Sequence, residues 1–147
     1  VPESEVRFWL TIHQTLSIIG YAAFSIAFAA GIMYLIQEHQ VKTKKLGIMY
    51  FRMPSLEVLD NLNFKVIMIG FPLFTLGFMT GSIWNTQIDQ PFFSWDLTRT
   101  LPLVVTWLIY CLIFFGRMVT GLRGKKAAQG AILGFVTVIG TYFLHIL

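Results

Sequence analysis

The chain has 147 residues, of which 56% are apolar and only 12% are charged, and its mean hydropathy is +0.70. A soluble domain of this size needs far more polar surface to cover its core, so the composition excludes a soluble globule and indicates a membrane protein. The single cysteine, Cys111, excludes an internal disulfide, a cysteine metal cage and a CxxCH haem-attachment motif. Because the chain opens on Val1 without a Met or a signal peptide, we expect it to be the downstream part of a longer or processed polypeptide.

Four apolar runs are long enough to cross a bilayer. They predict an all-α polytopic membrane bundle, a single domain with four transmembrane helices, because a helix satisfies its own backbone groups in lipid. None of the runs shows the period-2 alternation of a membrane β-strand. The predicted spans cover about residues 8–36, 66–84, 100–116 and 127–147, and a loop at 85–99 joins the second span to the third.

The positive charges predict the orientation of these spans. All but two of the eleven cations lie in the two connections at 37–65 and 117–126, and only Arg7 and Arg99 lie on the other side. The positive-inside rule therefore places both basic connections in the cytoplasm and both termini outside.

The first basic connection also has a helical pattern. Pro54 and Ser55 are typical of a helix start, and Leu56, Leu59 and Leu62 recur at helical spacing. This pattern predicts a short amphipathic helix at the inner interface before the second span, with a solvated linker as the alternative.

Small residues recur at intervals of four on three of the spans, which allows close approach of helices in lipid. Three such series favour a compact bundle over the chance abundance of small residues in membrane helices. They are Ala23, Ala27 and Gly31; Gly77 and Gly81; and Gly130 and Gly134.

The outer loop is rich in aromatic residues. Trp84 closes the second span, and the loop then carries Phe92, Phe93 and Trp95, with Asp96 next to them. These residues are either the aromatic belt of a membrane interface or a shelf for a flat apolar ligand, in which Asp96 interacts with a cation or braces the loop.

Two of the three histidines are predicted at the outer interface. His13 precedes the first apolar run, and His145 lies in the last turn of the fourth span, whereas His39 belongs to the cytoplasmic connection. Two facing imidazoles can ligate haem iron. The alternative is that each is a polar residue of the interface.

The sequence contains no Ser/His/Asp order, HExxH motif, P-loop or GxGxxG, and it supplies no catalytic residues. The basic connections lack the interleaved aromatic residues of a nucleic-acid surface, and membrane orientation already explains their charge, so we expect no nucleic-acid partner.

Several stretches resemble the haem-handling membrane proteins of cytochrome c biogenesis, the CcsA, CcmC and HemX superfamily. These stretches are PSLEVLDNLNFKVIMIGFPLFTLGFMTGSIW (54–84), FSWD (93–96), TWLIY (106–110), GLRGKKAA (121–128) and FWLTIHQTLSIIGYAAF (8–24). The resemblance covers nearly the whole chain, and in CcsA-like proteins this region is the C-terminal part of a longer protein.

The resemblance implies a haem site. His13 falls on an outer haem-ligand histidine, and Trp84, Phe93, Trp95, Asp96 and Thr100 fall on the tryptophan-rich WWD loop. The chain departs from the family pattern at three places. The loop has Asp89-Gln90 and Leu97-Thr98-Arg99 in place of its usual residues, the third span has Phe115 where CcsA-like members place a histidine, and His145 lies near the second outer histidine without aligning with it.

These departures favour a divergent or HemX-like member over a complete cytochrome c synthetase. The first hypothesis is a haem-binding biogenesis protein in a bacterial inner membrane or a thylakoid membrane. It would hold haem b through His13, with His145 opposite, and use a biogenesis partner with a large outer domain. The second is a structural or regulatory subunit of a membrane electron-transfer complex, in which the glycine-lined faces pack on partner helices.

Overall fold

The computed structural model describes residues 2–44, 51–52, 54–91 and 100–146. Residues 145 and 146 are described by their backbone alone. The main elements are α1 (Glu3–Thr43), α3 (Leu56–Gln87), α4 (Thr100–Phe115), the π-helical turn η1 (Gly116–Thr120) and α5 (Lys125–Ile146). In the described part of the chain, four helices are long and apolar enough to cross a membrane, as predicted. The chain is an integral membrane protein built as a helical bundle.

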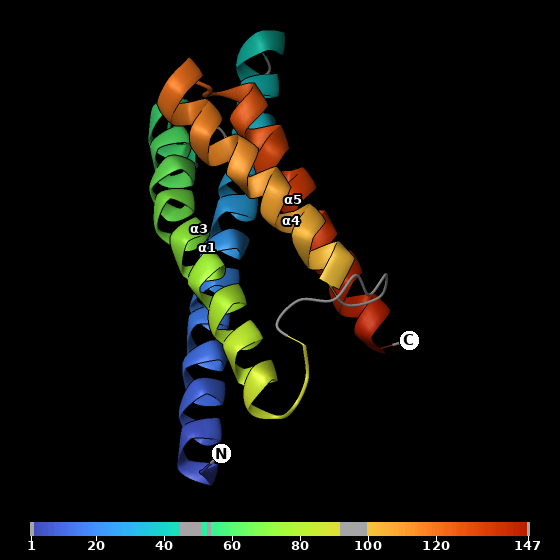
Figure 1. Ribbon diagram of the computed structural model, residues 1–147. Coiled ribbons are helices and arrows are strands. Elements are labelled where there is room, and N and C mark those ends of the chain that lie inside the picture. The colour runs from blue at the N-terminus through green and yellow to red at the C-terminus, as the bar shows by residue number, and fades with distance from the viewer. Residues whose placement is uncertain (1, 45–50, 53, 92–99, 147) are drawn as a thin grey trace.

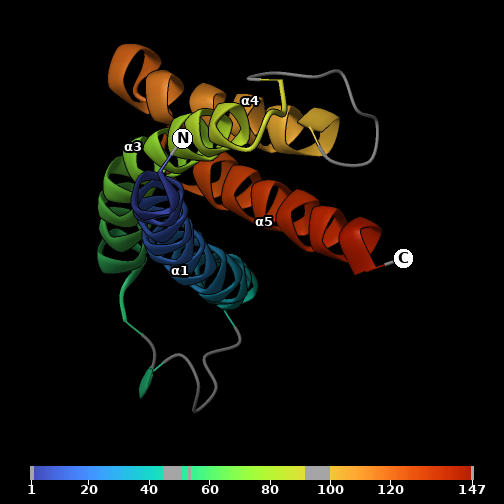
Figure 2. The same cartoon turned by 60° about the horizontal axis from the view of Figure 1, so that its bottom comes forward.

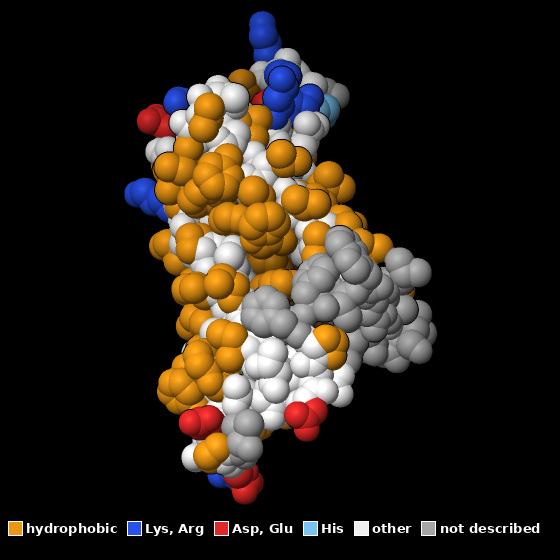
Figure 3. Space-filling model, viewed as in Figure 1, with side chains coloured by type: hydrophobic (Ala, Val, Ile, Leu, Met, Phe, Trp, Pro, Cys, Tyr) orange, Lys and Arg blue, Asp and Glu red, His pale blue; other side chains and the backbone are white. Residues whose placement is uncertain are grey.

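The helices form two antiparallel pairs, α1 with α3 and α4 with α5 (Figure 1). The pairs meet at the end where α1 leads into α3 and η1 leads into α5, and they splay apart toward the end that carries both termini (Figures 1 and 2). We call the end where the pairs meet the basic end, and the end that carries both termini the terminal end. Lysine and arginine side chains gather at the basic end, and apolar side chains cover the surface between the two ends (Figure 3).

Two of the helices, α1 and α3, extend well beyond the apolar runs that predicted them, whereas α4 and α5 match their runs to within two residues. With 41 residues, α1 is about 60 Å long, twice the hydrocarbon thickness of a bilayer. Apolar side chains in the middle of the spans are strongly exposed, as at Leu112 (73%) and Ile18 (67%), which is expected of surfaces that face lipid.

The structure differs from the prediction in the segment before the second span. The turns from Leu56 onward are not a separate interfacial helix but the beginning of α3, which continues to Gln87 without a break. The predicted start is correct, because the Ser55 hydroxyl accepts a hydrogen bond from the Val58 N–H and caps the helix. Leu59 is buried against the bundle, so this turn belongs to the core and not to a free amphipathic face.

An aromatic stack joins the two helix pairs at the centre of the bundle. The Phe24 and Tyr110 rings are parallel to within 4°, with centroids 3.6 Å apart, and both residues are fully buried. Phe74 packs against Phe24, and Ala131 of α5 belongs to the same cluster. All four helices therefore contribute to one core.

The predicted small-residue faces are used inside this bundle. A Cβ on Gly31 would lie 2.9 Å from the carbonyl oxygen of Ala128, and one on Gly134 would lie 2.7 Å from the Tyr110 ring. Gly77 similarly meets Ser17 of α1, and Gly130 meets Ile113 of α4. These glycines allow α1, α3, α4 and α5 to approach one another closely.

Hydrogen bonds between helices add to this packing. Asn63 donates to the carbonyl oxygen of Ala27 at 3.1 Å, and the Trp107 indole N–H donates to the Thr75 hydroxyl at 2.9 Å. They join α1 to α3 and α3 to α4, and each such bond between membrane helices contributes about 0.6 kcal/mol on average.

The orientation of the bundle stays a prediction that labelling can test. In a Cys111→Ser background, a cysteine at Thr86 marks the terminal end and one at Thr120 marks the basic end; both positions are exposed. We expect a membrane-impermeant maleimide added to intact cells or right-side-out vesicles to label the Thr86→Cys protein and not the Thr120→Cys protein. Labelling of Thr120→Cys alone would contradict the positive-inside assignment.

Candidate haem-ligand site at the terminal end

His13 lies on α1 and faces α3. Eleven residues of helix separate it from Phe24 in the core, which is about 16 Å along the axis and half the thickness of the hydrocarbon layer. His13 is half-buried, and its place near a membrane interface stays a prediction.

The backbone of α3 determines the tautomer of His13. The imidazole Nδ1 lies 2.7 Å from the carbonyl oxygen of Gly77. Because a carbonyl oxygen only accepts hydrogen bonds, Nδ1 carries the proton of a neutral ring and Nε2 keeps its lone pair. Nε2 has no hydrogen-bond partner within the part of the chain that the structure describes. A histidine whose Nδ1–H is held by a backbone carbonyl is the usual arrangement of a metal ligand, with Nε2 left to bind the metal.

Two glycines of α3 make this arrangement possible. Gly77 supplies the carbonyl oxygen, and Gly81, one turn further on, leaves room for the imidazole. A Cβ on Gly81 would lie 2.7 Å from His13 Cε1 and 2.8 Å from Nδ1, closer than such atoms can approach. Gly77 and Gly81, predicted as a helix-packing motif, therefore also form the contact surface for the imidazole, which we call the seat of His13.

The Gly81→Ala variant tests this seat. We expect the added methyl group to displace the imidazole from Gly77 and to destabilise the protein by about 1–3 kcal/mol. The loss of the supporting hydrogen bond should also weaken haem binding by about 10- to 100-fold, measured by haem titration. Gly140→Ala is the matched control, because a Cβ there meets nothing within 4 Å in the described structure. Equal behaviour of the two variants would show that Gly81 has no special role.

Trp84 lies on the same face of α3, one turn beyond Gly81. Its indole Nε1 is buried and has no hydrogen-bond partner among the described residues. A buried indole N–H normally has an acceptor, so the Trp84 indole can still donate one hydrogen bond to a group bound at this end.

The side chains of the other predicted site residues lie outside the described structure. Phe92, Phe93, Trp95 and Asp96 fall outside the described residues. His145 lies in the last turn of α5 by its backbone, and its side chain is also outside the description. That end of α5 splays away from the N-terminal half of α1 (Figures 1 and 2). The roles of these residues stay predictions.

Within the described residues, no group of three or more His, Cys, Asp or Glu side chains could hold a bare metal ion. Haem iron has different requirements, because the porphyrin supplies four ligands and the protein only one or two. The donor set at the terminal end, a single imidazole with a free Nε2, therefore fits haem better than a bare metal ion.

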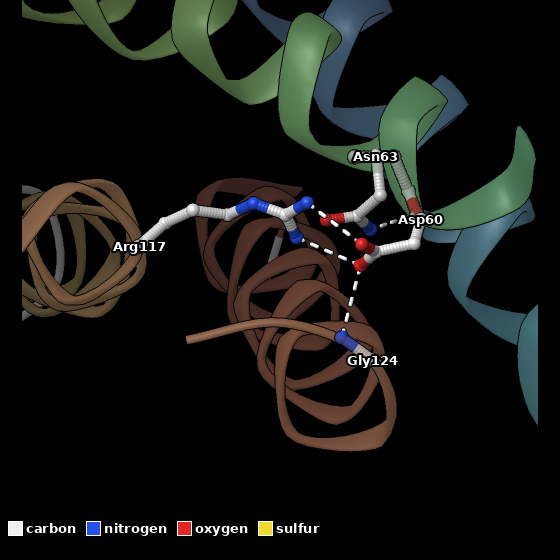
Figure 4. Close-up of polar contacts among 5 residues, drawn as sticks. Asp60, Asn63, Arg117 and Gly124 are labelled. Atoms are coloured by element: carbon white, nitrogen blue, oxygen red, sulfur yellow. Dashed lines mark hydrogen bonds and ion pairs between the residues drawn. The ribbon is translucent and has the colours of Figure 1, made fainter. Parts of the chain in front are cut away.

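A cluster at the basic end was not predicted. The Arg117 guanidinium donates to both carboxylate oxygens of Asp60, at 2.7 and 2.8 Å, and the Gly124 N–H donates to the same carboxylate at 2.9 Å. Figure 4 shows Arg117 reaching Asp60 from one side while Gly124 approaches from the chain leading into α5. We call these three residues the Asp60 latch. It joins α3, η1 and the residue before α5, and no sequence pattern singled out Asp60 from Glu38 and Glu57 in the same connection.

The described residues define a class: a helical membrane protein in which a histidine of one spanning helix is held by the backbone of the next. Residues 2–147 match the family described as Cytochrome C assembly protein. The chain belongs to this family.

Curated relatives agree with this assignment. The chain is 30% identical to Cytochrome c biogenesis protein CcsA of Guillardia theta, covering 92% of this chain and 51% of that protein. It is 33% identical to the CcsA protein of Chlamydomonas reinhardtii, covering 88% and 35%, and 32% identical to Protein HemX of Bacillus subtilis (strain 168), covering 92% and 49%. The chain spans about half the length of these relatives or less. No solved structure matches it.

Proposed function

We propose that the chain holds haem b at the terminal end of the bundle, on the outer face of a bacterial inner membrane or a thylakoid membrane, in cytochrome c biogenesis. The observation that carries this proposal is the 2.7 Å contact of His13 Nδ1 with the Gly77 carbonyl oxygen, because it leaves Nε2 available as an axial ligand. The names of the CcsA relatives supply the process.

In this proposal the chain binds and orients haem, and haem supplies the iron. His13 would hold the iron from α1, Trp84 would donate a hydrogen bond from its unpaired indole N–H, and Phe92, Phe93 and Trp95 would supply aromatic surface for the porphyrin. His145 would be the second candidate to hold the iron. Delivery of haem to an apocytochrome is assigned to a biogenesis partner with a large outer domain.

The alternative is a structural or regulatory subunit without haem. Its main support was the glycine-lined faces, which this fold uses for packing within the chain. An absorption spectrum of the protein purified from haem-replete cells separates the two proposals. A Soret band at near-stoichiometric haem supports the haem-binding role, whereas a colourless protein that co-purifies with other membrane subunits supports the alternative.

A further inference from the structure

A pocket of about 220 Å³ opens at the basic end, beside the Asp60 latch. Its walls come from the first turns of α3, from η1 and from the segment between η1 and α5. Arg117 and Arg123 supply two positive charges, Asp60 supplies one negative charge, and Phe64 and Leu122 supply apolar surface. The net charge of the lining is therefore positive.

The hydrogen bonds of the latch leave N–H groups of Arg117 available for another partner. A guanidinium has five N–H donors, and two are directed at Asp60. The group also lies over the Phe64 ring, with its central carbon 4.6 Å from the ring centroid, so Asp60 and Phe64 hold it at the wall of the pocket. Arg123 is exposed and free to turn toward a bound anion.

The pocket borders a narrow apolar groove between α3 and α4, which is too tight to admit a water molecule. Phe64 and Arg117 line both the pocket and the groove. The remaining walls of the groove are almost entirely apolar, with Ile67 and Met68 from α3 and Ile113 and Phe114 from α4. Phe115, Met118 and Val119 expose apolar side chains next to the pocket. A positively charged pocket at the edge of an exposed apolar surface matches a molecule with an anionic head and a hydrocarbon tail.

We propose that this pocket binds the phosphate of an anionic glycerophospholipid, whose acyl chains lie along the exposed apolar surface of α4 and η1. Arg117 and Arg123 contact the phosphate, because basic pockets between membrane helices bind such head groups. The bound lipid connects α3 with η1 at the same place as the latch.

Native mass spectrometry of the detergent-purified protein with added phosphatidylglycerol or phosphatidylcholine tests this proposal. We expect phosphatidylglycerol to bind several-fold more tightly, and Arg123→Gln to weaken its binding about fivefold, the effect of one cation near an anionic head group. Lys126→Gln is the matched control, since Lys126 is an exposed cation of the same segment that does not line the pocket. It should leave binding unchanged.

Three results would overturn the proposal. Equal binding of the two lipids would show that the pocket does not recognise an anionic head group. An equal loss of phosphatidylglycerol binding in Arg123→Gln and Lys126→Gln would show that the lipid is attracted to the positive charge of the basic end in general and not to this pocket. Competition by millimolar inorganic phosphate would identify a site for a free anion. Arg123 is outside the hydrogen bonds of the latch, so its replacement should leave the fold intact.

Discussion

Replacing His13 with alanine is expected to remove the Soret band of the purified protein. The substitution deletes the imidazole that Gly77 orients, and the neighbouring Gly81 offers no other donor atom for iron. Loss of residues that only support a ligand costs about 10- to 100-fold in affinity, so loss of the ligand itself should cost at least about 100-fold. Haem titration followed by absorbance measures the effect.

The matched control is His39→Ala. His39 is exposed near the basic end of the same helix, so its loss removes an imidazole without disturbing the seat at Gly77. The His39→Ala protein should keep the Soret band of the unmodified protein. His145→Ala addresses the second ligand: a changed band position at retained haem content would support His145 as the opposite axial ligand.

Replacing Asp60 with alanine is expected to have the largest effect on stability. Side-chain exposure is only 11% for Arg117 and 15% for Asp60. Without the carboxylate, a nearly buried guanidinium loses its counter-charge, and the Gly124 N–H loses its acceptor. Removal of one partner of a buried ion pair costs about 3–5 kcal/mol. Unfolding in nanodiscs or mixed micelles would measure the loss.

Two further variants make this prediction specific. Glu57→Ala removes an exposed carboxylate from the preceding turn of α3 and should cost no more than about 1 kcal/mol, the value of a charge at a helix N-terminus. The double variant Asp60→Ala/Arg117→Met should recover part of the loss, because it leaves no unpaired charge. An Asp60→Ala protein as stable as Glu57→Ala would contradict the latch as a stabilising contact.

Hydropathy was sufficient to predict the four spans because membrane helices must be long, apolar runs that satisfy their own backbone. It was not sufficient for the start of the second helix. Glu57, Asp60 and Asn61 interrupt the apolar run there and suggested a separate interfacial element. In the structure the Asp60 carboxylate is paired with Arg117, and the helix continues unbroken into the apolar run.

The candidate site could be predicted only in part, for a similar reason. His13 was found from its place before the first apolar run and from the family resemblance, both of which are local in sequence. Its partner Gly77 is 64 residues away, and the contact depends on the register between α1 and α3, which the spacing of small residues did not determine. In the Asp60 latch, Arg117 and Gly124 are separated from Asp60 by 57 and 64 positions in the sequence. Their contacts likewise depend on how three segments pack together.

The most direct test of the haem-ligand assignment is chemical rescue of the His13→Gly protein. If His13 Nε2 is an axial ligand, this variant should bind haem weakly, and added imidazole should restore a Soret band close to that of the unmodified protein by occupying the vacated position. A His13→Gly protein that already has the unmodified spectrum, or whose haem content and spectrum do not respond to imidazole, would contradict the assignment.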